Sequence, residues 1–396
     1  MTTEELIATG DRYVMNTYRR FPVVLVKGEG ARVWDSNGKE YLDFLAGIAV
    51  CSLGHSHPKV IEAIERQVEI LTHVSNLYYI EPQIRLARIL AENSFADKVF
   101  FCNSGAEANE AAIKLARKYA RDRMEGNRYE ILTMDNSFHG RTLATVTATG
   151  QQKFQVGFDP LPGGFTYVPF DDVSSVERAI TDVTCAVMVE PIQAEGGIRI
   201  PDDDYLCRLR ELCDTRGILL IFDEVQVGMG RTGTLFAYEQ SGIRPDIMTL
   251  AKALGNGFPV GAMLARDDVA SAFVPGTHAS TFGGNPLAMA AGSAVMEVLR
   301  DSDILDHCRE VGGYFLEKLA ELKNRHSIIT DVRGKGLILG VELAVAGDDI
   351  VRAMLEKGVL MNCTSGNVLR FVPPLIVGKR DIDRVIEVLD EVINTK

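Results

Sequence analysis

Asp223 and Lys252 each follow a short apolar run, so a carboxylate and an amine are expected at the ends of two buried strands. Residues 218–222 are all apolar, which predicts a strand with Asp223 at its carboxyl end, where open parallel sheets bind ligands. Lys252 directly follows a second largely apolar run, residues 247–251, so we expect its amine to be partly desolvated. Desolvation lowers the pKa of an amine and makes it available as a nucleophile. This pair suits pyridoxal phosphate: the lysine forms a Schiff base, and the aspartate keeps the pyridine nitrogen protonated, so that the ring accepts electrons.

The alternative for both residues is an ordinary surface position, because aspartate and lysine are mostly exposed in proteins. A phosphate site nearby favours the cofactor. A strand predicted at 98–102 runs into small residues and then a helix, whose free N–H groups and dipole bind anions with help from the Ser104 hydroxyl. A plain helix cap by Asn103 or Ser104 is the competing interpretation, and the lysine downstream favours the phosphate.

Three further side chains follow predicted strand ends. Phe138, after a strand at 130–134, can stack on a flat cofactor ring, and Arg141 can grip a carboxylate with its planar fork. Glu195, after a strand at 185–190, can mask an arginine that binds substrate. Core packing for Phe138, a surface ion pair for Arg141 and a solvated loop for Glu195 are the alternatives.

Two other patterns are weak signals. Residues 228–233 fit G-x-G-x-x-G, but a dinucleotide fingerprint opens a helix and has an acid roughly 20 residues further on, where this chain has Met248. His55 and His57 have a metal-ligand spacing without a cluster of partners. We therefore favour a turn before a helix from Pro58, and expect neither a nicotinamide site nor a metal.

The composition argues against several classes of partner. The 396 residues are 46% hydrophobic, enough for a large core, and the net charge of −12 argues against nucleic acid or an anionic membrane as main partner. The sequence contains no apolar run of membrane-spanning length, and its first residues lack the pattern of an export signal. Seven scattered cysteines indicate reduced thiols, so we expect a cytoplasmic protein.

Alternating strands and helices predict an α/β fold with a mostly parallel central sheet. Asn37-Gly38 marks a hairpin turn within residues 31–44. The last hundred residues mix helices with strand-like runs, which predicts a smaller α+β domain. We expect an N-terminal segment, 1–50, that packs with this small domain, a large cofactor-binding domain at 51–285, and the small domain itself at 286–396.

These motifs together resemble the class III pyridoxal-phosphate-dependent aminotransferases of fold type I. The resemblance runs in family order over nearly the whole chain. It is carried by Gly54-His-Ser-His-Pro58, Phe100-Phe-Cys-Asn-Ser-Gly-Ala-Glu-Ala-Asn109, Phe138-His-Gly-Arg-Thr142, Glu190-Pro-Ile-Gln193, Phe222-Asp-Glu-Val-Gln226, Gly228-Met-Gly-Arg-Thr-Gly233, Leu250-Ala-Lys-Ala-Leu-Gly255 and Ser280-Thr-Phe-Gly-Gly-Asn-Pro286.

The resemblance implies roles in cofactor binding. Lys252 carries the cofactor as a covalent aldimine and moves the proton, Asp223 holds the pyridine nitrogen, and Gln226 holds the ring hydroxyl. Phe138 stacks on the ring. The phosphate is held by Ser104, Gly105 and Ala106, joined by Thr281 from the other subunit of a homodimer with shared active sites.

The resemblance also implies how two substrates share one site. Arg141 binds the substrate carboxylate far from the reacting carbon, with Ser280 nearby. Arg370 binds the α-carboxylate of 2-oxoglutarate, and Glu195 covers it while an ω-amino donor is bound, so that no buried charge is left unpaired. Tyr18 lies where a free α-amino acid end is bound in ornithine transamination.

The implied activity is transfer of the δ-amino group of N-acetylornithine to 2-oxoglutarate in arginine biosynthesis. Ornithine, succinylornithine, succinyldiaminopimelate and 4-aminobutyrate remain alternative donors. Ala194 and Ala279 replace glycines that are usual in the family beside proposed site residues, which leaves the donor open. A non-catalytic protein on this fold is a further alternative, opposed by the intact Lys252, Asp223 and phosphate loop.

Overall fold

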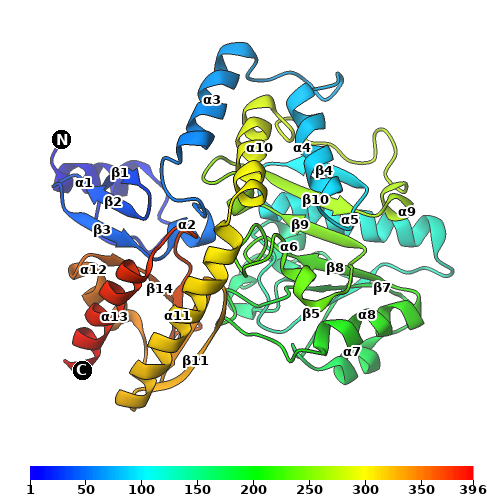
Figure 1. Ribbon diagram of the computed structural model, residues 1–396. Helices are drawn as coiled ribbons and strands as arrows, with labels where there is room; N and C mark the ends of the chain where they lie inside the picture. The colour runs from blue at the N-terminus through cyan, green and yellow to red at the C-terminus, as the bar shows by residue number, and fades with distance from the viewer. Residues whose placement is uncertain (396) are drawn as a thin grey trace.

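The computed structural model describes residues 1–395 and is built around a seven-stranded sheet (Figure 1). In spatial order its strands are β4 (Lys98–Cys102), β10 (Gly261–Ala265), β9 (Ile247–Leu250), β8 (Leu219–Asp223), β7 (Thr184–Val189), β5 (Glu130–Met134) and β6 (Phe165–Val168). β10 runs antiparallel to its neighbours β4 and β9, and the other pairs are parallel. Every strand except β10 therefore ends at one edge, which confirms the predicted mostly parallel sheet.

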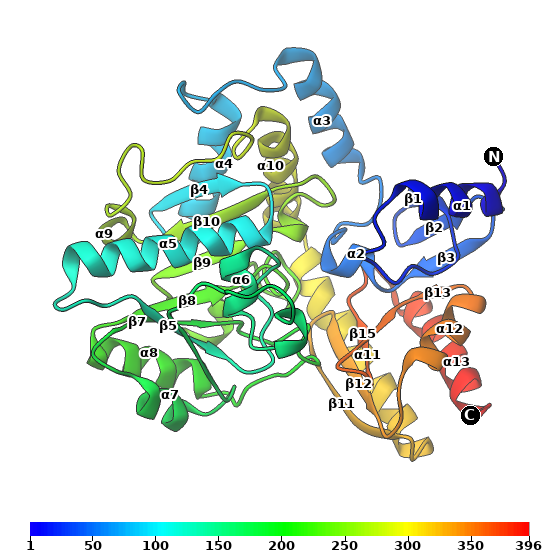
Figure 2. The ribbon, with the colours of Figure 1, turned by 180° about the vertical axis from the view of Figure 1, so that it is seen from behind.

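Helices cover both faces of this sheet because side chains alternate along each strand. Leu219 and Ile221 of β8 belong to the apolar cluster that includes α5 (Gly105–Arg123), which lies across one face in Figure 2. Phe222 belongs to the cluster on the opposite face, which includes α8 (Tyr205–Arg216). The remaining helices of this part are α3 (Pro58–Ile70), α4 (Glu81–Glu92), α6 (Leu143–Ala148), α7 (Val173–Ala179), α9 (Asp267–Ala270) and α10 (Pro286–Asp301).

Two four-stranded sheets lie beside the central one (Figure 1). The first joins the N-terminal strands β1 (Leu25–Glu29), β2 (Arg32–Asp35) and β3 (Glu40–Asp43) to β13 (Val359–Leu360). The second has the order β11 (Ile329–Lys335), β12 (Ile338–Leu343), β15 (Val368–Phe371) and β14 (Asn362–Thr364). The helices of these flanking parts are α1 (Thr3–Tyr13), α2 (Ala46–Ala49), α11 (Ile304–Arg325), α12 (Asp348–Glu356) and α13 (Lys379–Asn394).

The predicted hairpin at 31–44 is confirmed, since β2 pairs antiparallel with β3. A parallel pair between β3 and β13 then ties this hairpin to the C-terminal part of the chain. The boundaries at 50/51 and 285/286 stay a prediction. β6, α6 and α7 were not predicted from the sequence. Nor were the two- and three-residue strands β13 and β14, which are too short to show a periodic pattern.

Arg231, in the glycine-rich stretch 228–233, is a buried cation that joins three distant segments. Its guanidinium donates hydrogen bonds to the carbonyl oxygens of Leu337 and Pro373 and to Ser52 Oγ, 2.9 Å away. Among residues 1–395 no carboxylate lies within 4.0 Å of it, and burial lowers its pKa to about 10. The glycine motif is therefore a structural junction.

No helix in the described part of the chain is long and apolar enough to cross a membrane. The same residues contain no group of three or more His, Cys, Asp or Glu side chains placed to bind a metal ion. His55, one of the two histidines with ligand spacing, instead contacts Asp43, with 2.7 Å between Nε2 and Oδ2. α3 begins at Pro58, as predicted.

Candidate active site

A cavity of about 560 Å³ lies at the carboxyl ends of the parallel strands. Nine of the residues predicted for the site line this cavity: Tyr18, Ser104, Gly105, Ala106, Phe138, Arg141, Asp223, Gln226 and Lys252. They come from the N-terminal arm, from the start of α5, and from the segments that follow β5, β8 and β9. The sheet topology thus gathers residues that are more than 230 positions apart in the sequence.

Lys252 lies two residues beyond the end of β9, with a positive φ of 46°, which is strained for a residue with a side chain. Burial lowers the pKa of its amine to about 7, and the positive charge of Arg370 acts in the same direction. An amine with this pKa is about half unprotonated at pH 7, so a large fraction of it can attack a carbonyl carbon. The lowered pKa is the change expected from the apolar run that precedes Lys252.

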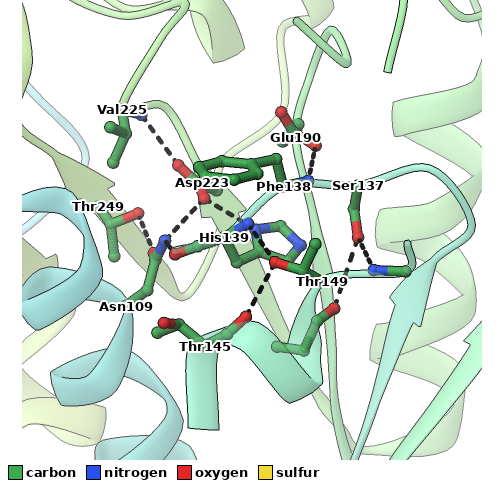
Figure 3. Close-up of polar contacts among 12 residues, drawn as sticks. Asn109, Ser137, Phe138, His139, Thr145, Thr149, Glu190, Asp223, Val225 and Thr249 are labelled. Carbon is green, nitrogen blue, oxygen red and sulfur yellow. Dashed lines mark hydrogen bonds and ion pairs between the residues drawn. The ribbon is translucent and has the colours of Figure 1, made fainter. Parts of the chain in front are cut away.

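Asp223 is buried at the end of β8 and is held by three hydrogen bonds (Figure 3). Its Oδ2 atom lies 2.8 Å from both Asn109 Nδ2 and His139 Nδ1, and its Oδ1 accepts a bond of 3.0 Å from the Val225 N–H. Thr249 donates to Asn109 Oδ1 at 2.7 Å, which fixes the orientation of that amide. A carboxylate stabilised in this way can pair with a protonated ring nitrogen.

Asn109 and His139 were not predicted as site residues. Asn109 lies on α5 and His139 follows β5, so only the folded chain brings them to the same oxygen of Asp223. The available signal was an amide on the apolar face of a helix, where a buried polar group needs a partner. For His139 the sequence offered only its place beside Phe138.

The start of α5 is compatible with both interpretations given for Ser104, a helix cap and a phosphate site. Ser104 is the N-cap, and its Oγ accepts the Glu107 N–H at 3.2 Å. Ser104, Gly105 and Ala106 line the cavity, so the N-terminal end of the helix, with its free N–H groups, borders it. At Gly105 a Cβ atom would lie 2.7 Å from Val225 Cγ1, so only glycine lets the helix start approach the cavity wall this closely.

These features fit pyridoxal phosphate. The donor set offers the half-buried Lys252 amine for its aldehyde, the buried Asp223 carboxylate for its pyridine nitrogen and the start of α5 for its phosphate. Phe138 adds an aromatic ring to the wall, and its N–H donates to Glu190 Oε2 at 3.0 Å (Figure 3). Full burial and the charge of Asp223 raise the pKa of Glu190, which favours its neutral form beside that carboxylate.

Glu195 and Arg370 form an ion pair with 2.8 Å between Oε2 and Nη1. Arg370, on β15, is 1% exposed, whereas the Glu195 side chain is 29% exposed. Ala194 is buried in an apolar cluster. Like Ala194, neither Glu195 nor Arg370 lines the cavity itself, but both charges act on the pKa of Lys252. The carboxylate of this pair can therefore reach solvent, and the guanidinium cannot.

Arg141 and Tyr18 lie at the exposed side of the cavity. The Arg141 guanidinium carbon is 4.0 Å from the centre of the Phe154 ring and 5.4 Å from that of Phe138. Tyr18 is 71% exposed. Both side chains line the cavity.

Ser280 and Thr281 do not line this cavity. They border a separate hollow of about 850 Å³ together with Ala279, and Ser280 Oγ lies 3.3 Å from Asn103 Nδ2. Large apolar side chains near this hollow are exposed, namely Leu77, Tyr78, Tyr79, Ile84, Val274 and Phe282. Within one chain, therefore, Thr281 is apart from the other phosphate-binding candidates.

Comparison with known proteins agrees with this geometry. The family described as aminotransferase class-III matches residues 13–393. The chain is 55% identical to an acetylornithine aminotransferase of Caldanaerobacter subterraneus subsp. tengcongensis, over 98% of this chain and 99% of that protein. It is also 55% identical to an acetylornithine aminotransferase of Methanocaldococcus jannaschii, over 99% and 98%.

Similar solved structures include aminotransferases that are named for two different substrates. An ornithine aminotransferase from Toxoplasma gondii ME49 is 38% identical, with a TM-score of 0.96 over 100% of this chain and 96% of that one. An acetylornithine aminotransferase from Elizabethkingia anophelis is 32% identical, with a TM-score of 0.90 over 100% of both chains.

Proposed function

The chain belongs to the class III aminotransferase family, and from that premise we propose that it transfers the δ-amino group of N2-acetyl-L-ornithine to 2-oxoglutarate. The products are N-acetyl-L-glutamate 5-semialdehyde and L-glutamate, formed by a ping-pong mechanism. The observation that carries this proposal is the Glu195–Arg370 ion pair at the site of Lys252, because it suits a donor and an acceptor with different charges at the reacting end.

The family depends on pyridoxal phosphate, which supplies an electron sink for the substrate carbon that loses its proton. We propose that Lys252 holds this cofactor covalently and then moves the proton, that Asp223 keeps the pyridine nitrogen protonated, and that Gln226 contacts the ring hydroxyl. Phe138 stacks on the ring. Ser104, Gly105 and Ala106 bind the phosphate through the start of α5.

The two substrates impose opposite demands on Arg370. N-acetylornithine reacts at an amine-bearing carbon without a carboxylate, so a free buried guanidinium there would lack a partner, and Glu195 supplies one. 2-Oxoglutarate carries a carboxylate beside its reacting carbon, which takes the place of Glu195 on Arg370. Arg141, at the exposed side of the cavity, binds the far carboxylate of both substrates. Ser280 borders the separate hollow in its own chain, so its proposed role near this carboxylate requires the second subunit.

We further propose a homodimer with shared sites. The exposed apolar side chains near the hollow at Ser280 and Thr281 form a patch that a second copy would cover. A symmetric interface would then place Thr281 of each subunit at the phosphate of the other. We place the reaction in arginine biosynthesis in the cytoplasm, which agrees with seven cysteines in the thiol form.

Ornithine is the second candidate donor. An ornithine aminotransferase has a TM-score of 0.96 to this chain, and Tyr18 lines the cavity where a free α-amino group would lie. The deciding experiment compares kcat/KM for five donors with 2-oxoglutarate as acceptor: N-acetylornithine, ornithine, succinylornithine, succinyldiaminopimelate and 4-aminobutyrate. We expect N-acetylornithine to give the highest value. A higher value for another donor would transfer the assignment to that substrate.

A further inference from the structure

The three-residue strand β14 contacts both members of the Glu195–Arg370 pair. Asn362 and Thr364 are its first and last residues, so their side chains lie on the same face of the strand. Asn362 stands directly opposite Arg370 in the antiparallel pairing with β15, and Thr364 contacts the main chain of Glu195. Cys363, between them, points to the other face.

Asn362 holds the guanidinium of Arg370 at one corner. Its Oδ1 atom lies 3.1 Å from Arg370 Nε, while Glu195 Oε2 contacts Nη1 at the far end of the group. Since Nε is occupied, a carboxylate must meet the Nη1 and Nη2 end of the fork. The acceptor is a neutral amide, so it orients Arg370 without cancelling the positive charge.

Thr364 and two arginines hold the backbone of the loop that carries Glu195. Thr364 Oγ1 donates to the Glu195 carbonyl oxygen, Arg199 Nε donates to Gly196 O at 3.1 Å, and Arg333 Nη2 donates to Gly197 O at 2.6 Å. The loop is closed at its base by reciprocal backbone bonds between residues 193 and 199, of 3.0 and 2.9 Å. The main chain is thus fixed on both sides of Glu195, and its partly exposed side chain is the part that remains free to turn.

From these contacts we infer that Asn362 and Thr364 are positioning residues. They hold their neighbours in place, so that the site changes from one substrate to the other by rotation of the Glu195 side chain alone. Asn362 keeps Arg370 aimed at the reacting carbon after Glu195 leaves. Thr364 keeps the Glu195 backbone in place, so that the carboxylate returns to the same position. The inference rests on the proposed exchange between a donor and a dicarboxylic acceptor, and it adds that the charge at position 362 must be zero.

Replacement of the amide by a carboxylate of the same shape tests this directly. In Asn362→Asp a permanent anion would neutralise Arg370, so the affinity of the holoenzyme for glutarate, an unreactive dicarboxylate, should fall roughly 100-fold. The half-reaction with the amino donor should change less than threefold. Asn362→Ser, which keeps a neutral side chain, should lose roughly tenfold in glutarate affinity and serves if the aspartate variant does not fold.

Thr364→Val should act in the opposite direction. It removes the hydroxyl that holds the Glu195 backbone, so the donor half-reaction should slow several-fold while glutarate binds more tightly. Thr364→Ser, which keeps the hydroxyl, should give the wild-type donor half-reaction rate and the wild-type glutarate affinity. Cys363→Ala, on the same strand with its side chain on the other face, is the matched control and should leave both half-reactions unchanged.

The measurements are glutarate titration, single-turnover rates of both half-reactions, and thermal unfolding of each variant. Unchanged glutarate affinity in Asn362→Asp, or equal slowing of both half-reactions in Asn362→Asp and Thr364→Val, would overturn the inference. If the wild-type enzyme uses another ω-amino donor, the proposed donor is wrong and this test still applies. If the wild-type enzyme has no affinity for glutarate, the proposed dicarboxylic acceptor and the inference about Asn362 and Thr364 are both wrong.

Discussion

His139 Nδ1 lies 2.8 Å from Asp223 Oδ2, and the imidazole that carries it is fully buried. Asn109 reaches the same oxygen at the same distance. Two donors on one oxygen hold the carboxylate in a single orientation. The cofactor nitrogen would therefore meet an oriented carboxylate at the end of β8.

Asp223→Asn should slow the chemical step by several orders of magnitude with little change in fold. The amide keeps the shape of the side chain but cannot hold the pyridine nitrogen protonated, so the ring loses its capacity to accept electrons. Single-turnover rates and circular dichroism measure the two effects. A rate equal to wild type would end the electron-sink assignment for Asp223.

His139→Asn should slow the same step by a smaller factor, roughly 10- to 100-fold, because one of the hydrogen bonds to a charged group is lost. The pH profile of the half-reactions should shift, since this contact orients the Asp223 carboxylate that is proposed to pair with the pyridine nitrogen. Thermal unfolding serves as the control for damage to the core. A loss of stability without a change in the pH profile would make His139 a packing residue only.

The rate of covalent capture of pyridoxal phosphate by the cofactor-free protein should level off within about one pH unit above 7. Only the unprotonated amine attacks, and burial lowers the pKa of Lys252 to about 7, so the reactive fraction is about one half at that pH and nearly complete about one unit above it. An ordinary lysine, with a pKa of about 10.4, would continue to gain rate up to pH 10. Absorbance of the attached cofactor follows the reaction, and Lys252→Ala should show neither capture nor transamination.

Glu195→Ala should affect the two half-reactions in opposite directions. Arg370 would stay free, so glutamate, which has an α-carboxylate, should react faster and N-acetylornithine more slowly. Arg370→Ala should harm 2-oxoglutarate far more than the donor, and Arg141→Ala should harm both. Single-turnover kinetics of each half-reaction separate these patterns. Equal slowing of glutamate and N-acetylornithine by Glu195→Ala would leave Glu195 as a structural loop residue.

Coexpression of two inactive variants tests the shared site. Thr281→Ala and Lys252→Ala lie in different chains of one proposed site, so a mixed dimer contains one intact site and should regain activity. Asp223→Asn with Lys252→Ala is the matched control, because both residues belong to the same chain and no intact site forms. Absence of recovery in the first mixture, or a fully active monomer in sedimentation, would contradict the shared dimer.

The parts of the site that follow from the sequence are those carried by strong apolar runs. Asp223 and Lys252 could be placed because β8 and β9 are buried on both faces and end at the same edge. Glu195 was proposed from its place after a predicted strand, whereas Arg370 came only from the family resemblance. Their contact joins a loop to a strand of another sheet, and no periodicity records that geometry. Asn109, His139 and Thr364 were missed because their partners lie far away in sequence. Asn362 was missed because its strand, β14, has only three residues, too few to show a periodic pattern.

The buried guanidinium of Arg231 has a consequence for how the molecule unfolds. It lacks a carboxylate partner within the described residues, so its charge is stabilised by carbonyl groups before β12 and after β15 and by a hydroxyl near α2. Separation of these segments would leave a charge and several acceptors unsatisfied at once. The central sheet and the flanking sheets should therefore lose their structure in one cooperative calorimetric transition, and Arg231→Met should split it into two.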